Sequence, residues 1–233
     1  MFRKWLGMLV ALGITMGALA QFVLVPLAEK ALVRFAAKLP ADRVEVEIAS
    51  FPAWELLQGS IDRLNWQAEG IQFQEFTLER LEGSFEEVRL SWWELWQERR
   101  PDYSFAEPGE VIITLSEDNL KQYLMGRLNV PLENPEVAMQ GLQVELTAAW
   151  TIGGQKLPLL LTGRLELEGS HTIVLIPERV QVGSFVPGSE LQKKLLGNAS
   201  FQLPVERLPV RVEFYRLEGG PGKIRLLGRV FLK

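Results

Sequence analysis

The alternation of apolar and polar residues is clearest in residues 142–168, which read LQVELTAAWTIGGQKLPLLLTGRLELE. From Leu142 to Ile152 the even positions carry mostly large apolar side chains, and the odd positions include Gln143 and Glu145. A period of two is typical of a β-strand with one buried face. This strand of about 11 residues is roughly twice the usual length. Gly153-Gly154 then predicts a tight hairpin.

The same pattern extends in both directions from this hairpin. A return strand is expected over 155–168, a turn at Gly169-Ser170 and a third strand over 171–176. A C-terminal hairpin is expected from strands 208–217 and 223–232 around a glycine-rich turn at 219–222. Upstream, the expected strands are 43–48, 60–68, 71–81 and 85–90. Long antiparallel strands with one apolar face need elements that cover that face.

Amphipathic helices are expected to provide this cover. Residues 28–39 carry apolar side chains at helical spacing, and Pro40 ends the pattern. A second helix begins at the N-cap Ser116, a third occupies 189–197, and a short helix has its cap and first turn at Ser50-Phe51-Pro52 and ends near Gly59. The predicted fold is α+β, with one long curved antiparallel sheet wrapped around amphipathic helices. Because no linker divides it, residues 28–233 are expected to form a single domain.

The N-terminus contains no charge between Lys4 and Glu29. Residues 5–28 are therefore long enough for a membrane-spanning helix, which needs about 20 apolar residues. Residues 1–27 are interpreted either as a retained single-pass signal anchor or as a signal peptide cleaved after Ala20, at the end of Ala18-Leu19-Ala20. The first interpretation predicts a cell-membrane protein with an extracytoplasmic domain, and the second a secreted or periplasmic one.

Composition excludes several classes of function. The net charge is -4, which argues against a nucleic-acid partner. Without cysteine there is neither a disulfide nor a thiol site, and the lone histidine, His171, is interpreted as an exposed turn residue rather than a metal ligand or base. We expect no catalytic residue, no metal and no cofactor, and therefore no enzyme. A hydrolase with an unrecognised site is the weakest of three functional hypotheses, and the two stronger ones are given at the end of this section.

An aromatic cluster occupies residues 91–101, which read SWWELWQERRP. Its Trp92, Trp93 and Trp96 precede Arg99 and Arg100. Tryptophan favours the membrane–water interface, and arginine can pair with lipid phosphates, so these five residues are a candidate membrane-interface segment. The alternative is ordinary aromatic packing under the sheet. Both interpretations remain open at this point.

Three groups of motifs resemble the LmeA-like phospholipid-binding domains. They are VEVEIASFP (44–52) with LLQGSIDRL (56–64), LSEDNLKQYL (115–124), and a C-terminal group of FQLP (201–204), LPVRV (208–212), Gly219-Gly220 and LGRV (227–230). The motifs keep their order and cover nearly all of the chain beyond Pro40. The resemblance implies a curved TULIP-like sheet around helices, phospholipid binding, an envelope role and no enzymatic centre. It identifies no residue that reads a headgroup.

Phospholipid acyl chains would then lie between the concave face of the sheet and the helices. The expected contacts are Leu142, Val144, Leu146, Trp150, Val210, Val212 and Phe214 on the sheet, and Leu32, Phe35, Leu120, Leu124, Leu191 and Leu195 on the helices. The alternative function is a membrane-tethered structural or adaptor protein with a filled core, whose protein partner stays unspecified. Alternation does not separate the two, because a lipid cavity and a dry core require the same pattern.

Overall fold

The computed structural model describes residues 21–34, 40–73, 76–91, 103–127, 132–152, 154–188, 200–202 and 211–231. Its helices are an N-terminal helix over 21–34, η1 (Ala53–Gln58) and α3 (Glu117–Arg127). Its strands are β1 (Arg43–Ala49), β2 (Ser60–Phe73), β3 (Phe76–Leu90), β4 (Tyr103–Phe105), β5 (Gly109–Ser116), β6 (Leu132–Gln140), β7 (Gln143–Ile152), β8 (Gln155–Glu168), β9 (Thr172–Val182), β10 (Ser200–Gln202), β11 (Arg211–Gly220) and β12 (Lys223–Phe231).

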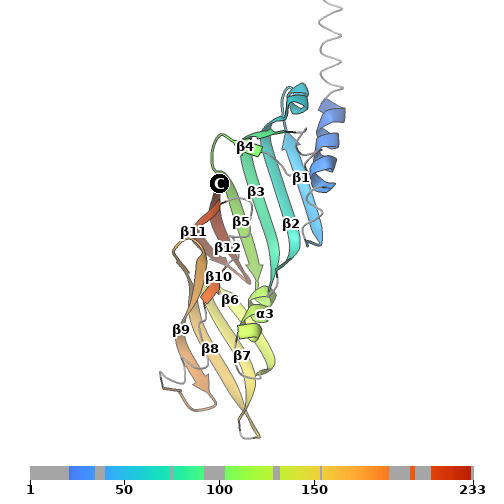
Figure 1. The fold of residues 1–233 in the computed structure, drawn as a ribbon. Helices are drawn as coiled ribbons and strands as arrows, with labels where there is room; N and C mark the ends of the chain where they lie inside the picture. Colours follow the sequence, from blue (N-terminus) through green and yellow to red (C-terminus); the bar gives the residue numbers. More distant parts are fainter. Residues whose placement is uncertain are drawn as a thin grey trace, which may run out of the picture. The chain divides into compact units, whose positions relative to one another are not determined.

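The strands form two open sheets (Figure 1). One has the order β1-β2-β3-β5-β12-β11, with β4 paired to β3, and the other has the order β10-β9-β8-β7-β6. This confirms an α+β fold that is mostly antiparallel sheet with few helices. The expectation of one long sheet is wrong, because α3 follows β5 directly and β6 then starts a second sheet. Alternation within a strand does not indicate which strand it pairs with.

The chain divides into two compact units. The first unit takes its residues from 1–68 and 82–110, together with residue 232. The second unit takes residues 69–81 and 111–231, together with residue 233. The long strands β2 and β3 therefore contribute residues to both units.

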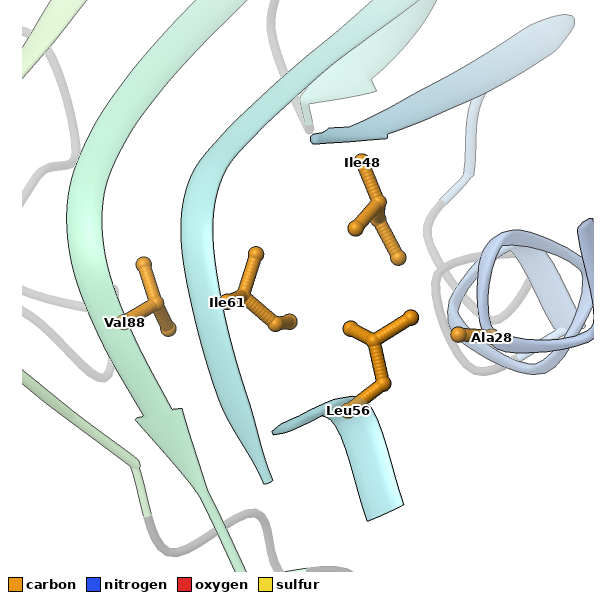
Figure 2. Close-up of a cluster of buried hydrophobic side chains, with 5 residues drawn as sticks. All are labelled: Ala28, Ile48, Leu56, Ile61 and Val88. Carbon is orange, nitrogen blue, oxygen red and sulfur yellow. The ribbon is translucent and has the colours of Figure 1, made fainter. Parts of the chain in front are cut away.

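The core of the first unit lies between the N-terminal helix and the sheet. Ala28, Ile48, Leu56, Ile61 and Val88 are buried together, and each comes from a different element (Figure 2). The helix adds partly buried Leu24, Val25 and Leu32 to this cluster. Its packing face therefore follows the spacing of three and four residues that an amphipathic helix requires.

Two hydrogen bonds also hold the N-terminal helix against β1 and the residue that follows it. The Gln21 side-chain amide donates to the Ser50 carbonyl at 3.1 Å, and the Ile48 backbone N–H donates to the Glu29 carboxylate at 3.1 Å. Packing thus begins at Gln21, before the expected start of the apolar stripe at Ala28. Ala31, which was expected on that stripe, is exposed.

The short helix after residues 50–52 is present as the 3₁₀ helix η1 and ends at Gly59, as predicted. The expected capping is wrong: Pro52 is the N-cap, and the Ser50 hydroxyl instead donates to the Ser60 carbonyl at 3.4 Å. Gly59 has a φ of 83°, and a Cβ there would lie 1.8 Å from the Leu90 carbonyl oxygen. Glycine at this position therefore permits both the left-handed turn and the close approach of β3.

The second unit contains the predicted α3 helix. Asn119 N–H donates to the Ser116 hydroxyl at 3.3 Å, and Ser116 N–H donates to the Asn119 side-chain oxygen at 3.0 Å, a reciprocal cap of the kind that starts helices. Leu120, Tyr123 and Leu124 are buried, as the apolar stripe predicts. In this unit α3 packs on β6, and β11 packs on β8 and β6.

The turns at 169–171 and 221–222 lie at predicted hairpin positions, although Gly219 and Gly220 of the expected turn 219–222 belong to β11. Ile152 pairs with Gln155, as the hairpin predicted at 153–154 requires. Two predicted strand breaks are wrong, because β2 continues through Gly70 and β3 continues through Gly83. Gly83 has a packing role: a Cβ there would lie 2.0 Å from the Trp66 ring nitrogen. The glycine makes room for an indole on the neighbouring strand. In the sequence alone, the same glycine suggests a turn.

Leu56→Ala should lower the free energy of unfolding by about 2–5 kcal/mol, because it leaves a cavity in the first unit's core. Leu57→Ala, one residue later on the same helix, is the matched control. Leu57 is 68% exposed, so its truncation should stay within about 0.5 kcal/mol. Urea denaturation of the full chain measures both. Equal losses for the two variants would contradict this packing.

Candidate functional site

His171 has a structural role at the turn between β8 and β9. Its Nε2 lies 2.9 Å from the Val212 carbonyl oxygen, and its Nδ1 lies 2.9 Å from the Ser170 hydroxyl. Because a carbonyl only accepts, Nε2 must carry a hydrogen, and in a neutral ring Nδ1 then accepts from the serine hydroxyl. Phe214 N–H also donates to the Ser170 carbonyl at 3.0 Å. The turn is thus fastened to β11, and the exposed histidine is a turn residue, as expected.

Glu117, at the start of α3, likewise has a structural role, because it makes hydrogen bonds to neighbouring elements. Its carboxylate accepts the Met139 backbone N–H at 2.7 Å, and its own N–H donates to the Gly222 carbonyl at 3.3 Å. Gly222 N–H donates in turn to the Met139 carbonyl at 3.2 Å. These bonds connect α3, β6 and the turn before β12. Among the described residues, no group of three histidine, aspartate or glutamate side chains is placed to hold a metal ion.

A further feature of the second unit is the apolar face of its sheet. Its strands align side chains in rows, since cross-strand partners share one face of a sheet. One row is Val137, Leu146, Leu161 and Val180 across β6, β7, β8 and β9. The next row toward the 153–154 hairpin is Ala148, Leu159 and Val182, and the last is Leu132, Trp150 and Leu157.

Burial falls along these rows. Leu146 is 0% exposed and Leu161 is 3% exposed, whereas Leu132, Trp150 and Leu157 are half-buried. The inner rows are covered within the second unit, where α3 and β11 pack on this sheet. We call the row of Leu132, Trp150 and Leu157 the open row. It is an apolar surface that is continuous with the core and still partly accessible.

The opposite face of the sheet at this end is polar. The Glu133 carboxylate accepts from Lys156 at 2.6 Å and from the Thr151 hydroxyl at 3.0 Å. The hydrogen bond from Lys156, followed by that from Thr151, holds the pKa of Glu133 below its usual range. This end of the second sheet is therefore apolar on one face and charged on the other.

The structure brings some of the predicted lipid contacts together in the second unit. Leu120, Leu124, Val144, Leu146, Val212 and Phe214 are all buried there, at 0–5% exposure. Leu142 and Trp150 are half-buried in the same unit, whereas Leu32 is half-buried in the first. Phe35, Leu191, Leu195 and Val210 lie outside the described residues, as do Trp92, Trp93, Trp96, Arg99 and Arg100.

Sequence reasoning missed two members of the open row. Leu157 was predictable, because a two-residue turn at 153–154 pairs Ile152 with Gln155 and hence Trp150 with Leu157. Leu132 was not, since the register between β6 and β7 shifts between Glu133 and Glu136. An irregularity of this kind reverses the face expected from simple alternation.

The expected N-terminal anchor, 1–27, falls largely on residues 1–20, which are not described. Within the part of the chain that the structure does describe, no helix is long and apolar enough to cross a membrane.

Comparison with known proteins identifies a family. The family model described as LmeA-like phospholipid-binding matches residues 18–229. No curated protein and no solved structure gives a significant match. The family match covers most of the chain, including the N-terminal helix, both sheets and α3. The chain therefore belongs to the LmeA-like phospholipid-binding family.

Lys156→Met should raise the pKa of Glu133 toward its usual value, and Thr151→Val should raise it less, because the lysine hydrogen bond has the larger effect. Since the folded pKa lies below the unfolded one, this pairing stabilises the fold above the unfolded pKa and is lost as pH falls through the folded pKa. NMR titration of the Glu133 carboxyl measures the change. An unchanged pKa in Lys156→Met would contradict the assigned cause.

Proposed function

We propose, from membership of the LmeA-like phospholipid-binding family, that this chain is an extracytoplasmic, membrane-associated protein that binds phospholipid and serves lipid handling or maintenance in a cell envelope. The family match over residues 18–229 is the observation that carries the proposal. In this proposal the chain has no catalytic activity and no nucleic-acid partner, and its ligand is the acyl part of a lipid.

The open row is the proposed point of acyl contact. Its Leu132, Trp150 and Leu157 are half-buried, so a lipid chain can bury further apolar area there without first unfolding the sheet. Each methylene removed from water contributes about 0.8 kcal/mol, so a micromolar affinity, which is about 8.2 kcal/mol, requires burial of roughly ten methylenes or more. Deeper rows are already buried by protein, so an acyl chain reaches Leu146 only by displacing part of the second unit.

The N-terminal run supports membrane association in this proposal. Residues 5–20 hold no charge, and the described contacts of the N-terminal helix begin at Gln21. A retained run would tether the chain to the bilayer. Cleavage after Ala20 would instead release a chain that keeps every described contact of this helix.

The alternative function is a membrane-tethered adaptor with a filled core and no lipid ligand. A specific observation favours it: Val144, Leu146, Val212 and Phe214 are at most 3% exposed, as in an ordinary core. The two functions differ at the open row, because an adaptor with a filled core requires no lipid contact there.

Photo-cross-linking tests the proposal on the full chain. The chain is reconstituted in phosphatidylcholine vesicles that contain a phospholipid with a diazirine in its acyl chain, and the labelled peptides are mapped by mass spectrometry. We expect labelling within 132–157. Trp150→Asp should reduce it roughly tenfold, which corresponds to ~1.4 kcal/mol of lost affinity, because a carboxylate on the open row repels an acyl chain.

Gln143→Asp is the matched control, since it places the same charge on the exposed face of the same strand. It should label like the unmodified chain. Circular dichroism melts confirm that both variants stay folded, and Leu157→Asp replaces Trp150→Asp if the latter does not. Labelling confined to the N-terminal run, with none in 132–157, would sink the lipid site and support the adaptor.

A further inference from the structure

Three large apolar side chains of the first unit project into solvent from one short segment. Phe51 is 83% exposed, Trp54 is 52% exposed and Leu57 is 68% exposed. They are spaced three residues apart, and a 3₁₀ helix has three residues per turn. Trp54 and Leu57 therefore share the outer side of η1, and Phe51 precedes them at the same spacing.

The inner side of η1 has the opposite character. Ala53 and Leu56 are 2% and 3% exposed, and Leu56 belongs to the core cluster of the first unit (Figure 2). The helix is thus packed on one side while its largest side chains point outward.

Hydrogen bonds hold the segment in place at both ends. Phe51 N–H donates to the Asp62 carboxylate at 2.8 Å, and Glu55 N–H donates to the Pro52 carbonyl at 3.0 Å. At the other end, Leu90 N–H donates to the Gly59 carbonyl at 2.7 Å. The apolar side chains are therefore presented by a fixed backbone, and their insertion elsewhere would require no ordering of the segment.

The start of the N-terminal helix adds to this surface. Gln21 is hydrogen bonded to Ser50, so the residues that follow each of them, Phe22 and Phe51, lie close to this junction. Phe22 is 81% exposed and Val23 is 53% exposed. Figure 1 shows η1 and the beginning of the described helix at the same end of β1. We call Phe22, Val23, Phe51, Trp54 and Leu57 the apolar tip.

We propose that the apolar tip docks on the surface of a lipid bilayer, with Phe51, Trp54 and Leu57 at the boundary between headgroups and acyl chains. Exposed apolar patches mark interaction surfaces, and tryptophan suits the interface because an apolar ring carries a polar N–H. Interfacial binding strengthens with the apolar area that is buried. The tip supplies that area from side chains that are already exposed.

The sequence before the tip identifies the bilayer as the occupant. Residues 5–20 hold no charge and lead directly into Gln21, the residue that is hydrogen bonded beside Phe51. An uncharged run that enters a membrane would bring this end of the unit to the membrane surface. Glu47, Glu55 and Asp62 are the charged residues nearest Phe51, Trp54 and Leu57 in the sequence, and all three are acidic, so docking should not require anionic lipid.

This proposal rests on the membrane association in the proposed function and is independent of the open row. The chain has no cysteine, so a single introduced cysteine can be labelled uniquely. A nitroxide is placed at Leu57→Cys in the full chain, which is reconstituted in phosphatidylcholine nanodiscs. Asp42→Cys is the matched control, because Asp42 is exposed and precedes β1, whereas Ser50 follows that strand.

Accessibility to oxygen and to a water-soluble nickel chelate is then measured by electron paramagnetic resonance. We expect the label at 57 to gain oxygen collisions and to lose nickel collisions several-fold relative to the label at 42. Adding Trp54→Asp should return the label at 57 to water. Adding Gln58→Asp, on an exposed polar residue of the same helix, should leave it in the membrane.

Three outcomes would overturn the proposal. Equal nickel accessibility at 57 and 42 in nanodisc-bound chain would show that the tip stays in water, while membrane association stands. Protection of the label at 57 from both oxygen and nickel would show that protein covers the tip, such as a second copy of the chain. A chain that does not co-purify with nanodiscs would contradict both the docking and the membrane association.

Discussion

The apolar faces of long antiparallel strands must be covered, and this constraint organises both units. A sheet buries one face only if another layer lies on it. In the first unit that layer is the N-terminal helix, whose Ala28 belongs to one buried cluster with Ile48, Ile61 and Val88 from the strands. In the second unit, α3 and β11 pack on the sheet of β6 to β10. Wherever the cover ends, apolar side chains remain accessible.

The helix that covers the first unit uses part of the uncharged run that predicts a membrane segment in the sequence. The residues that pack on the sheet, Leu24, Val25 and Ala28, belong to the same uncharged run that suggests a membrane segment in the sequence. Hydropathy does not separate the two roles, because lipid and a protein core select the same side chains. The hydrogen bonds of Gln21 to Ser50 and of Ile48 to Glu29 show that residues 21–29 pack on the protein, and such contacts are visible only in three dimensions.

Much of the fold was predictable because its determinants are local. The two-residue hairpin at 153–154, the Ser116 cap and the alternating strand β1 all depend on neighbours a few residues away. The wrong predictions concern residues whose conformation depends on contacts with residues distant in the sequence or on another strand. Gly83 accommodates Trp66, and Ser50 bonds to Ser60 instead of capping η1. The division into two sheets depends on pairing between strands, which alternation does not encode.

The candidate site was predictable in kind but only partly in place. Sequence pattern placed Trp150 on the apolar face, and the hairpin register adds Leu157 beside it. Whether such a face is core or surface depends on its cover, and only the structure shows that cover thinning from Leu146 to Trp150. Val144 and Phe214, which were predicted to contact lipid, are buried in the protein interior. Close packing leaves few voids there, so an acyl chain has little space beside them.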